Sequence, residues 1–270
     1  MKIAVVTFEC DPGKCRRLSF PNKRKYCQQH GYTFVSGRKR LLTDRPASWS
    51  KLAYVLRAMP AHDWVFWSDA DSLIIATDRR LEELIDPSYD FIVSMDAKGL
   101  NMGQFLAKSC SWTKHLLQSL IDYPHKQRQR TPHRVLHQKH WEQRALKLMI
   151  ATEPWRSQFE EHAAVYPYHD PRNFNTWPRH ATKDTFLVHY PGKQRDYWGQ
   201  DLKELKMNDE KLEHVKRRWM REIYDRPEDV DRDSSYVWEG LLLGFLLGAG
   251  VPLNQSLEIA RGAPGNGWEL

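Results

Sequence analysis

The stretch DWVFWSDADSLI, from Asp63 to Ile74, joins a strongly apolar run to two acidic residues that stand one position apart. The run Trp64–Trp67 is aromatic and β-branched, which is the composition of a strand buried on both faces. Asp69 and Asp71 follow where this strand ends and a loop begins. In an open, mostly parallel sheet, ligands bind beyond the carboxyl ends of the strands. The position of the two acids therefore predicts a ligand site.

Predicted strands and helices alternate on both sides of this stretch. The strands are predicted at Lys2–Phe8, Tyr32–Val35, Phe91–Met95, Asn101–Ser109 and Thr185–His189, and the helices at Pro21–His30, Ser48–Met59, Arg79–Ile85, Ser111–Ile121 and Trp141–Ile150. Pro21 is expected in the first turn of its helix, and Gly31 just past its end. This alternation predicts the α/β class, as a single Rossmann-like domain with a central, mostly parallel sheet flanked by helices.

The 270 residues are enough for one large domain, which we assign to residues 1–225. Polar, basic residues at 123–139 predict a loop, and residues 200–225 a charged helical segment. We assign residues 226–270 to a C-terminal extension with a short apolar helix at 240–251, too short and too rich in glycine to span a bilayer. A buried helix is the favoured interpretation, while an oligomer contact and a peripheral membrane contact stay open.

The net charge of +7 indicates an anionic partner, but it does not choose between a nucleic acid, an anionic membrane and a phosphorylated substrate. Cys10, Cys15, Cys27 and Cys110 lack zinc-type spacing, and the N-terminus carries no secretory signal, so we expect free thiols in a reducing compartment. The predicted location is the cytoplasm, as in a bacterial or viral protein, unless a membrane anchor has been removed from a Golgi-type protein.

Carboxylates at positions i and i+2, such as Asp69 and Asp71, suit a hard cation such as Mn²⁺ or Mg²⁺ that also holds substrate phosphates. The alternative is a solvated turn capped by Asp71 or Ser72. His189 closes another apolar run and is either a further ligand or a hydrogen-bonded core residue.

Gly192 and Lys193 offer a close backbone approach and a point charge, as a diphosphate requires. Together with the acids and His189, they predict a site where a cation and Lys193 neutralise a leaving nucleotide diphosphate.

Five blocks of the sequence, in this order, resemble those of glycosyltransferase family 34, the galactosyltransferase, mannosyltransferase and xyloglucan xylosyltransferase group. They are NKRKYCQQHGYTF, SWSKLAYVLRAMPAHDWVFWSDADSLI, LNMGQFLAKSCSWTKHLLQSL, WEQRALKLMI and VHYPGK, and they span roughly residues 1 to 195. The resemblance implies a GT-A fold, a nucleotide-sugar donor, which we expect to be a UDP-sugar, a bound Mn²⁺ and transfer with retention at the anomeric carbon.

The resemblance also implies roles for single residues. Asp69, Asp71 and His189 match the metal ligands. Lys51 matches a position that lines the donor site, and Asn101 with Gly103 matches a block beside the sugar.

Glu142 and Gln143 match an acid and a glutamine on the far face of the sugar in the family. A carboxylate or an amide oxygen there would stabilise an oxocarbenium-like transition state. As an alternative, both residues could simply cap the first turn of their helix. The chain departs from the family at Trp141, which replaces the first of two consecutive acids, and at Lys193, which stands one residue closer to the histidine.

The sequence thus predicts a metal-dependent retaining glycosyltransferase that acts on a saccharide or glycolipid acceptor. Alternatives are a catalytically silent nucleotide-sugar- or carbohydrate-binding protein, a nucleotide-sugar hydrolase, and a metal-dependent nucleic-acid-binding protein. No nucleic-acid motif appears, so we expect no nucleic-acid partner; homo-oligomer formation stays open. Several aromatic residues are candidate platforms for sugar rings, with core packing as the alternative: Trp155, Tyr166, Tyr168, Trp177, Tyr197 and Trp198.

Overall fold

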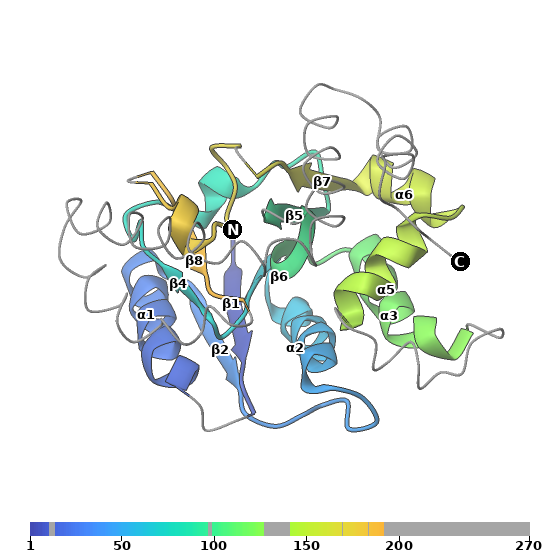
Figure 1. The fold of residues 1–270 in the computed structure, drawn as a ribbon, viewed down its shortest axis with the longest axis horizontal. Helices are drawn as coiled ribbons and strands as arrows, with labels where there is room; N and C mark the ends of the chain where they lie inside the picture. The colour runs from blue at the N-terminus through green and yellow to red at the C-terminus, as the bar shows by residue number, and fades with distance from the viewer. Residues whose placement is uncertain (11–13, 97–98, 127–140, 169, 183, 192–270) are drawn as a thin grey trace, which may run out of the picture. The chain divides into compact units, whose positions relative to one another are not determined.

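The structure, a computed structural model, describes residues 1–10, 14–96, 99–126, 141–168, 170–182 and 184–191. Its main feature is a six-stranded sheet with the order β2-β1-β3-β6-β5-β7 (Figure 1). These strands are β1 Ile3–Phe8, β2 Thr33–Gly37, β3 Trp64–Ser68, β5 Phe91–Asp96, β6 Gly99–Lys108 and β7 Ala163–Tyr166. A second sheet pairs β4 Ser72–Ile74 with β8 Leu187–His189.

The strands beside β1 fix the direction of the main sheet. β1 runs parallel to β2 and to β3, with Ile3 opposite Trp64, whereas β3 runs antiparallel to β6. Every residue of β1 and β3 is buried, as expected where helices cover both faces of a sheet. The predicted α/β class, with a mostly parallel central sheet flanked by helices, is confirmed.

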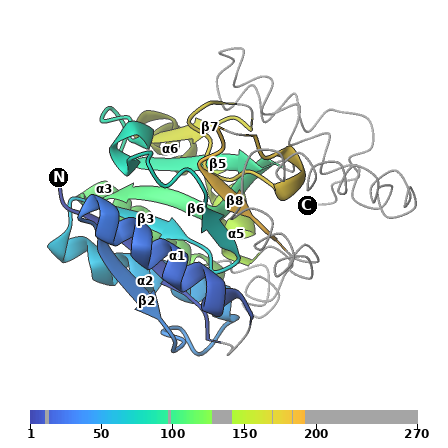
Figure 2. The ribbon, with the colours of Figure 1, turned by 90° about the vertical axis from the view of Figure 1, so that its left-hand side faces the viewer.

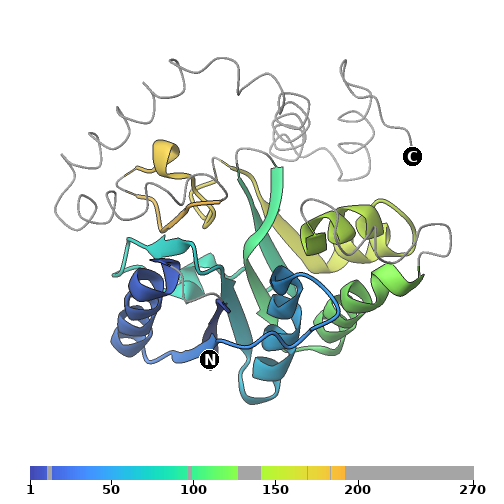
Figure 3. The ribbon, with the colours of Figure 1, turned by 60° about the horizontal axis from the view of Figure 1, so that its bottom comes forward.

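Five α-helices are described: α1 Lys14–His30, α2 Ser50–Ala58, α3 Ser111–Lys126, α5 Trp141–Ile150 and α6 Trp155–His162. Short 3₁₀ helices lie at Ala47–Trp49, Met59–Ala61, Leu81–Leu84 and Pro178–His180. Helix α1 contacts β1 and β2 on one face, while α2 contacts β1 and β3 on the other (Figures 2 and 3). Helix α3 packs against α2 and α5, and α5 against α6.

The chain divides into two compact units. The first unit comprises Met1–Ala70, Arg80–Val93 and Met102–Ala164, and it contains all the described α-helices. The second unit comprises Asp71–Arg79, Ser94–Asn101 and the described residues of Val165–Leu270, with β4 and β8. The predicted boundary at residue 225, the helical segment 200–225 and the apolar helix 240–251 lie outside the described residues and stay predictions.

Helix α1 differs from its prediction at one end. It begins at Lys14, so that Pro21 lies inside the helix and the expected first-turn position was wrong. Proline in a helix interior removes a backbone hydrogen bond, while the burial of Cys15 and Phe20 in the turns before it favours the helix. Gly31 ends the helix as expected, with a φ of 73° that glycine adopts without strain.

Four other predictions about elements were wrong in part. The expected helix at Arg79–Ile85 is the 3₁₀ helix Leu81–Leu84. The strand predicted at Asn101–Ser109 is β6, which already starts at Gly99 and has Gly103 in its interior. The predicted loop overlaps the last turn of α3, which continues to Lys126, while residues 127–140 lie outside the described part. β8 pairs antiparallel with β4, so His189 does not end a strand of the main sheet.

Candidate active site

Asp69 follows the end of β3 and is held through its backbone as well as its side chain. Its N–H donates to the carbonyl of Gly103 at 2.9 Å, and the Nζ of Lys23, a buried residue of α1, donates to its carbonyl oxygen at 2.8 Å. The indole Nε1 of Trp67 donates to Oδ1 of Asp69 at 2.8 Å. All these groups belong to the first unit. The aspartate that the sequence predicted as a metal ligand is therefore fixed in place by β3, β6 and α1.

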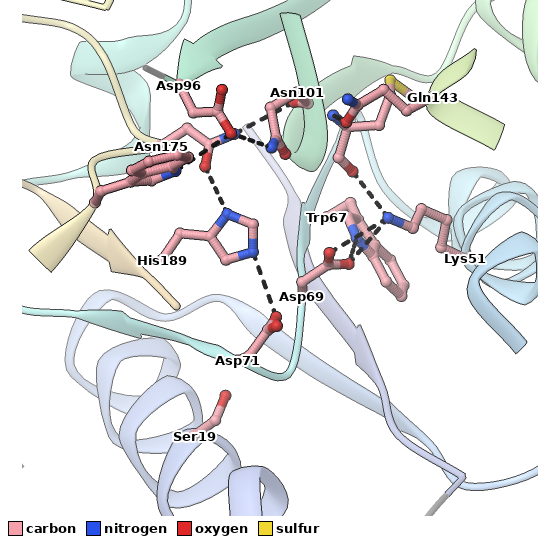
Figure 4. A network of polar contacts seen from close by, with 12 residues as sticks. Ser19, Lys51, Trp67, Asp69, Asp71, Asp96, Asn101, Gln143, Asn175 and His189 are labelled. Carbon is pink, nitrogen blue, oxygen red and sulfur yellow. Dashed lines mark hydrogen bonds and ion pairs between the residues drawn. The ribbon is translucent and has the colours of Figure 1, made fainter. Parts of the chain in front are cut away.

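Lys51 projects from α2 and joins two carboxylates. Its Nζ lies 3.1 Å from Oδ1 of Asp69 and 2.8 Å from Oε1 of Glu142, and it donates to the carbonyl of Met102 at 3.0 Å (Figure 4). The side chain is only 5% exposed. Burial alone would lower the pKa of Lys51, but the charges of Asp69 and Glu142 and the hydrogen bonds to them outweigh it and raise the pKa above its ordinary value. Lys51 therefore stays a cation.

Glu142 and Gln143 come from the first turn of α5 in the first unit, where Glu142 pairs with Lys51. Glu142 is buried, and among the described residues its Oε2 has no hydrogen-bond partner. The Oε1 of Gln143 accepts the backbone N–H of Met102 at 3.0 Å, which ties α5 to β6. The structure thus brings Lys51, Asp69, Glu142 and Gln143 together. One lysine thus faces two acids.

Asp71 and His189 face each other within the second unit. Nε2 of His189 lies 3.4 Å from Oδ1 of Asp71, and both side chains are about 95% buried. The pairing of β4 with β8 sets this contact, because Ser72 stands opposite His189, and the N–H of Tyr190 donates to the carbonyl of Asp71 at 2.8 Å.

Asn175 determines which nitrogen of His189 carries the proton. The amide Nδ2 of Asn175 donates to the carbonyl of Asn101 at 3.3 Å, so its Oδ1 is the atom that lies 2.8 Å from Nδ1 of His189. An oxygen can only accept, hence Nδ1 is protonated in the neutral ring and Nε2 presents a lone pair toward Asp71. Two lone-pair donors that face each other in a buried place fit a cation between them.

Further hydrogen bonds connect Asn101, the partner of Asn175, to Asp96. The side-chain amide of Asn101 donates to Oδ2 of Asp96 at 2.5 Å, and the indole of Trp177 donates to the same oxygen at 3.3 Å. All four residues are buried in the second unit. Sequence reasoning missed Asn175 and Asp96, although the segment Asn173–Trp177, NFNTW, is unusually rich in hydrogen-bonding side chains for a stretch between apolar runs.

Asp69 lies at the end of the first unit, while Asp71 and His189 lie in the second. Because only Ala70 separates the two aspartates, the chain itself keeps their carboxylates close together. Gly103 contributes its carbonyl to Asp69, as described above. Gly192 and Lys193 lie outside the described residues, so their predicted contact with a diphosphate stays a prediction.

The chain is similar in sequence to known glycosyltransferases. It is 28% identical over 177 residues to a probable alpha-1,6-mannosyltransferase of Saccharomyces cerevisiae, covering 51% of this chain and 43% of that protein. It is 28% identical over 106 residues to a galactomannan galactosyltransferase of Cyamopsis tetragonoloba, covering 35% of this chain and 24% of that protein. The chain thus spans less than half the length of these curated relatives.

A solved structure shows the same fold. The crystal structure of a glycosyltransferase involved in the glycosylation of the major capsid of PBCV-1 matches with a TM-score of 0.57 at 16% identity, over 74% of this chain and 100% of that chain. The predicted GT-A fold is confirmed. Among the described residues, no helix has the length and apolar character needed to cross a membrane.

The family model of the galactosyl transferase GMA12/MNN10 family matches residues 9–89 and 86–205. These ranges include every block that carried the resemblance to glycosyltransferase family 34, and they cover more than half of the sequence. The chain belongs to the galactosyl transferase GMA12/MNN10 family.

Proposed function

We propose that the protein is a metal-dependent, retaining glycosyltransferase that moves a hexose or pentose from a nucleotide-diphosphate sugar, most simply a UDP-sugar, to a saccharide or glycolipid acceptor. Family membership supports the reaction class. The observation that carries the metal dependence is the lone pair of His189 Nε2, which Asn175 directs toward the carboxylate of Asp71.

Asp69, Asp71 and His189 are the residues proposed to hold Mn²⁺ or Mg²⁺. Carboxylate and imidazole side chains fit either ion, with imidazole favouring Mn²⁺. When bound, the cation supplies charge neutralisation for the diphosphate that leaves. Lys193 and the backbone at Gly192 are proposed to contact the same diphosphate, and Lys51, Asn101 and Gly103 to line the donor site.

Glu142 and Gln143 are proposed to act on the sugar. The buried Oε2 of Glu142, which lacks a partner among the described residues, is proposed to stabilise an oxocarbenium-like transition state. Lys51 holds the other oxygen of Glu142, so the carboxylate has a fixed orientation. Gln143 is anchored beside it through Met102, and we propose that it lies on the far face of the sugar.

We propose the cytoplasm as the working compartment. None of Cys10, Cys15, Cys27 and Cys110 forms a disulfide in the structure, which suits a reducing environment.

The test is a thermal-shift panel of UDP-glucose, UDP-galactose, UDP-xylose and GDP-mannose, each with and without Mn²⁺. A ligand that binds the folded state raises the melting temperature, and a donor present at 100 times its Kd stabilises by about 2.7 kcal/mol. We expect one UDP-sugar to stabilise the protein only when Mn²⁺ is present. Asp71→Ala should abolish this shift while the protein alone melts as a cooperative unit.

Asp78→Ala is the matched control, because it removes the same charge from an exposed position seven residues away in the same unit. It should leave the Mn²⁺-dependent shift unchanged. Absence of a shift with every donor, or a full shift in Asp71→Ala, would contradict the proposal. The panel is followed by analysis of the anomeric configuration of the product, where inversion would exclude the retaining mechanism.

A further inference from the structure

The helical layer of the first unit contains a hollow away from the residues described so far. It lies among α3, α5 and α6, and its volume is about 190 Å³. Helix α5 carries Glu142 near one end and Met149, which lines the hollow, near the other, roughly 10 Å further along the axis. The lining residues are His115, Ser119, Tyr123, Met149, Pro154, Trp155 and Gln158.

Several hydrogen-bonding groups line this hollow without a partner. Ser119 is 7% exposed, and neither its hydroxyl nor the carboxamide of Gln158 nor the ring nitrogens of His115 make a hydrogen bond to any described residue. A hydroxyl, carboxamide or ring nitrogen that is not already bonded within the protein can bond a ligand or water. These groups therefore leave hydrogen-bonding capacity for a bound molecule.

The rest of the wall is apolar and aromatic. The rings of His115 and Trp155 are stacked, with centroids 5.2 Å apart and an interplanar angle of 21°, and Met149 is 1% exposed. The lining contains no aspartate, glutamate, lysine or arginine. The hollow consequently offers little to a phosphate or a metal cation, whereas it suits a neutral ligand that has both an apolar face and several hydroxyl groups.

A pyranose ring has this character, because its C–H groups make an apolar face and its hydroxyls point outward around the ring. Aromatic side chains bind such faces through their large, flat apolar surface. Pockets for drug-sized ligands usually measure about 300–1,000 Å³, so the smaller hollow suits a single ring rather than an oligosaccharide.

We propose that this hollow binds one neutral sugar ring of a saccharide, as a site separate from the donor site. Trp155 supplies the apolar wall, and Ser119, Gln158 and His115 supply hydrogen bonds to the hydroxyls. The inference rests on the proposed function for its biological meaning, since a saccharide acceptor would then have a second point of attachment. The binding itself requires neither donor nor metal.

The test is saturation-transfer difference NMR of the full chain with methyl α-mannopyranoside, methyl α-galactopyranoside and methyl α-xylopyranoside, without nucleotide and with EDTA. At least one glycoside should receive saturation and give a measurable Kd. Gln158→Ala should weaken its binding by roughly fivefold, the effect of one lost hydrogen bond. Trp155→Ala should abolish the signal. Gln118→Ala removes the same side chain from an exposed position of α3 outside the hollow and should change nothing.

Absence of binding by all three glycosides overturns the inference, as does binding that survives both Gln158→Ala and Trp155→Ala. Because Trp155 is partly buried, the melting temperature of Trp155→Ala is first compared with that of the wild type. If Trp155→Ala is destabilised, the inference is judged from glycoside binding by Gln158→Ala alone. Asp71→Ala separates this inference from the proposed function, because it should lose donor binding and keep glycoside binding. Glycoside binding without any use of a donor would count against the proposed function alone.

Discussion

At His189, a single hydrogen bond decides the chemistry of the ring. The amide of Asn175 cannot turn around without giving up its bond to the carbonyl of Asn101, so it accepts from Nδ1 and leaves Nε2 as the electron-pair donor. Lys51 shows the same dependence on neighbours, because two carboxylates keep it charged in a place where burial alone would favour the neutral amine. The tautomer of His189 and the charge of Lys51 therefore depend on neighbouring residues, and residue type alone does not determine them.

We expect Asn175→Leu to weaken Mn²⁺ binding by about tenfold or more, because loss of a group that orients a ligating histidine typically costs that much. Isothermal titration calorimetry of Mn²⁺ without a donor measures this directly. Asn175→Asp is the informative partner variant, since its carboxylate can still accept from Nδ1 and should keep much of the affinity. Equal Mn²⁺ affinities of Asn175→Leu and the wild type would disprove the positioning role.

Lys51→Met should lower the free energy of unfolding by about 3 kcal/mol, because it leaves the buried carboxylate of Glu142 and the partly buried one of Asp69 without their cation. Urea unfolding measures the change. Adding Glu142→Gln to this variant should recover part of the loss, since it removes one of the uncompensated charges. The control is Lys108→Met, where the ion pair with Asp90 is 41% exposed at the lysine and should contribute less than about 1 kcal/mol.

At the scale of the elements, the sequence correctly predicted β3 as a buried strand that is followed by Asp69. A run of residues buried on both faces of a sheet has a distinctive apolar composition. The sequence did not indicate the partner of β8, since a short apolar run is equally compatible with parallel and antiparallel pairing. Lys23 was missed because a lysine in a helix usually faces solvent, and its bond to Asp69 exists only once α1 packs on the sheet. Asn175 was missed because it lies between elements, where periodicity carries no information.

Cys27 on α1 should report on the opening of that helix. Burial raises the pKa of its thiol to about 12, so almost no thiolate is present at pH 8. We expect iodoacetamide to modify the exposed Cys10 at pH 8 and to leave Cys27 unmodified until urea unfolds the protein, as followed by peptide mass spectrometry. Modification of Cys27 as fast as Cys10 in the absence of urea would show that α1 does not stay packed.

Gly37→Ala should destabilise the end of β2. A Cβ at this position would lie 2.2 Å from the ring of Tyr54, which stacks on Phe8 and donates to the carbonyl of Lys39. Overpacking of this kind typically costs about 1–3 kcal/mol. Thermal unfolding should show the loss, and adding Tyr54→Leu should recover part of it; a double variant that is less stable than Gly37→Ala would argue for a different cause.

At the scale of the whole molecule, the charge of +7 is a property that several functions share. We expect low-affinity binding to DNA of any sequence at 50 mM salt, because a basic surface releases counterions from the phosphates, and we expect it to disappear near 300 mM. Fluorescence anisotropy with two unrelated duplexes measures this. Tight binding at 300 mM salt, or a preference for one duplex, would support the alternative hypothesis that the protein is a nucleic-acid-binding protein.

Lys51, between Asp69 and Glu142, also affects the stability of the protein when no metal is bound. A site made only of acids would repel itself when empty, and the protein would depend on its cation to stay folded. Here the positive charge of Lys51 would remain if the proposed cation left. Without Mn²⁺ the protein would then lose its proposed activity but stay folded. Activity would return once Mn²⁺ is supplied again.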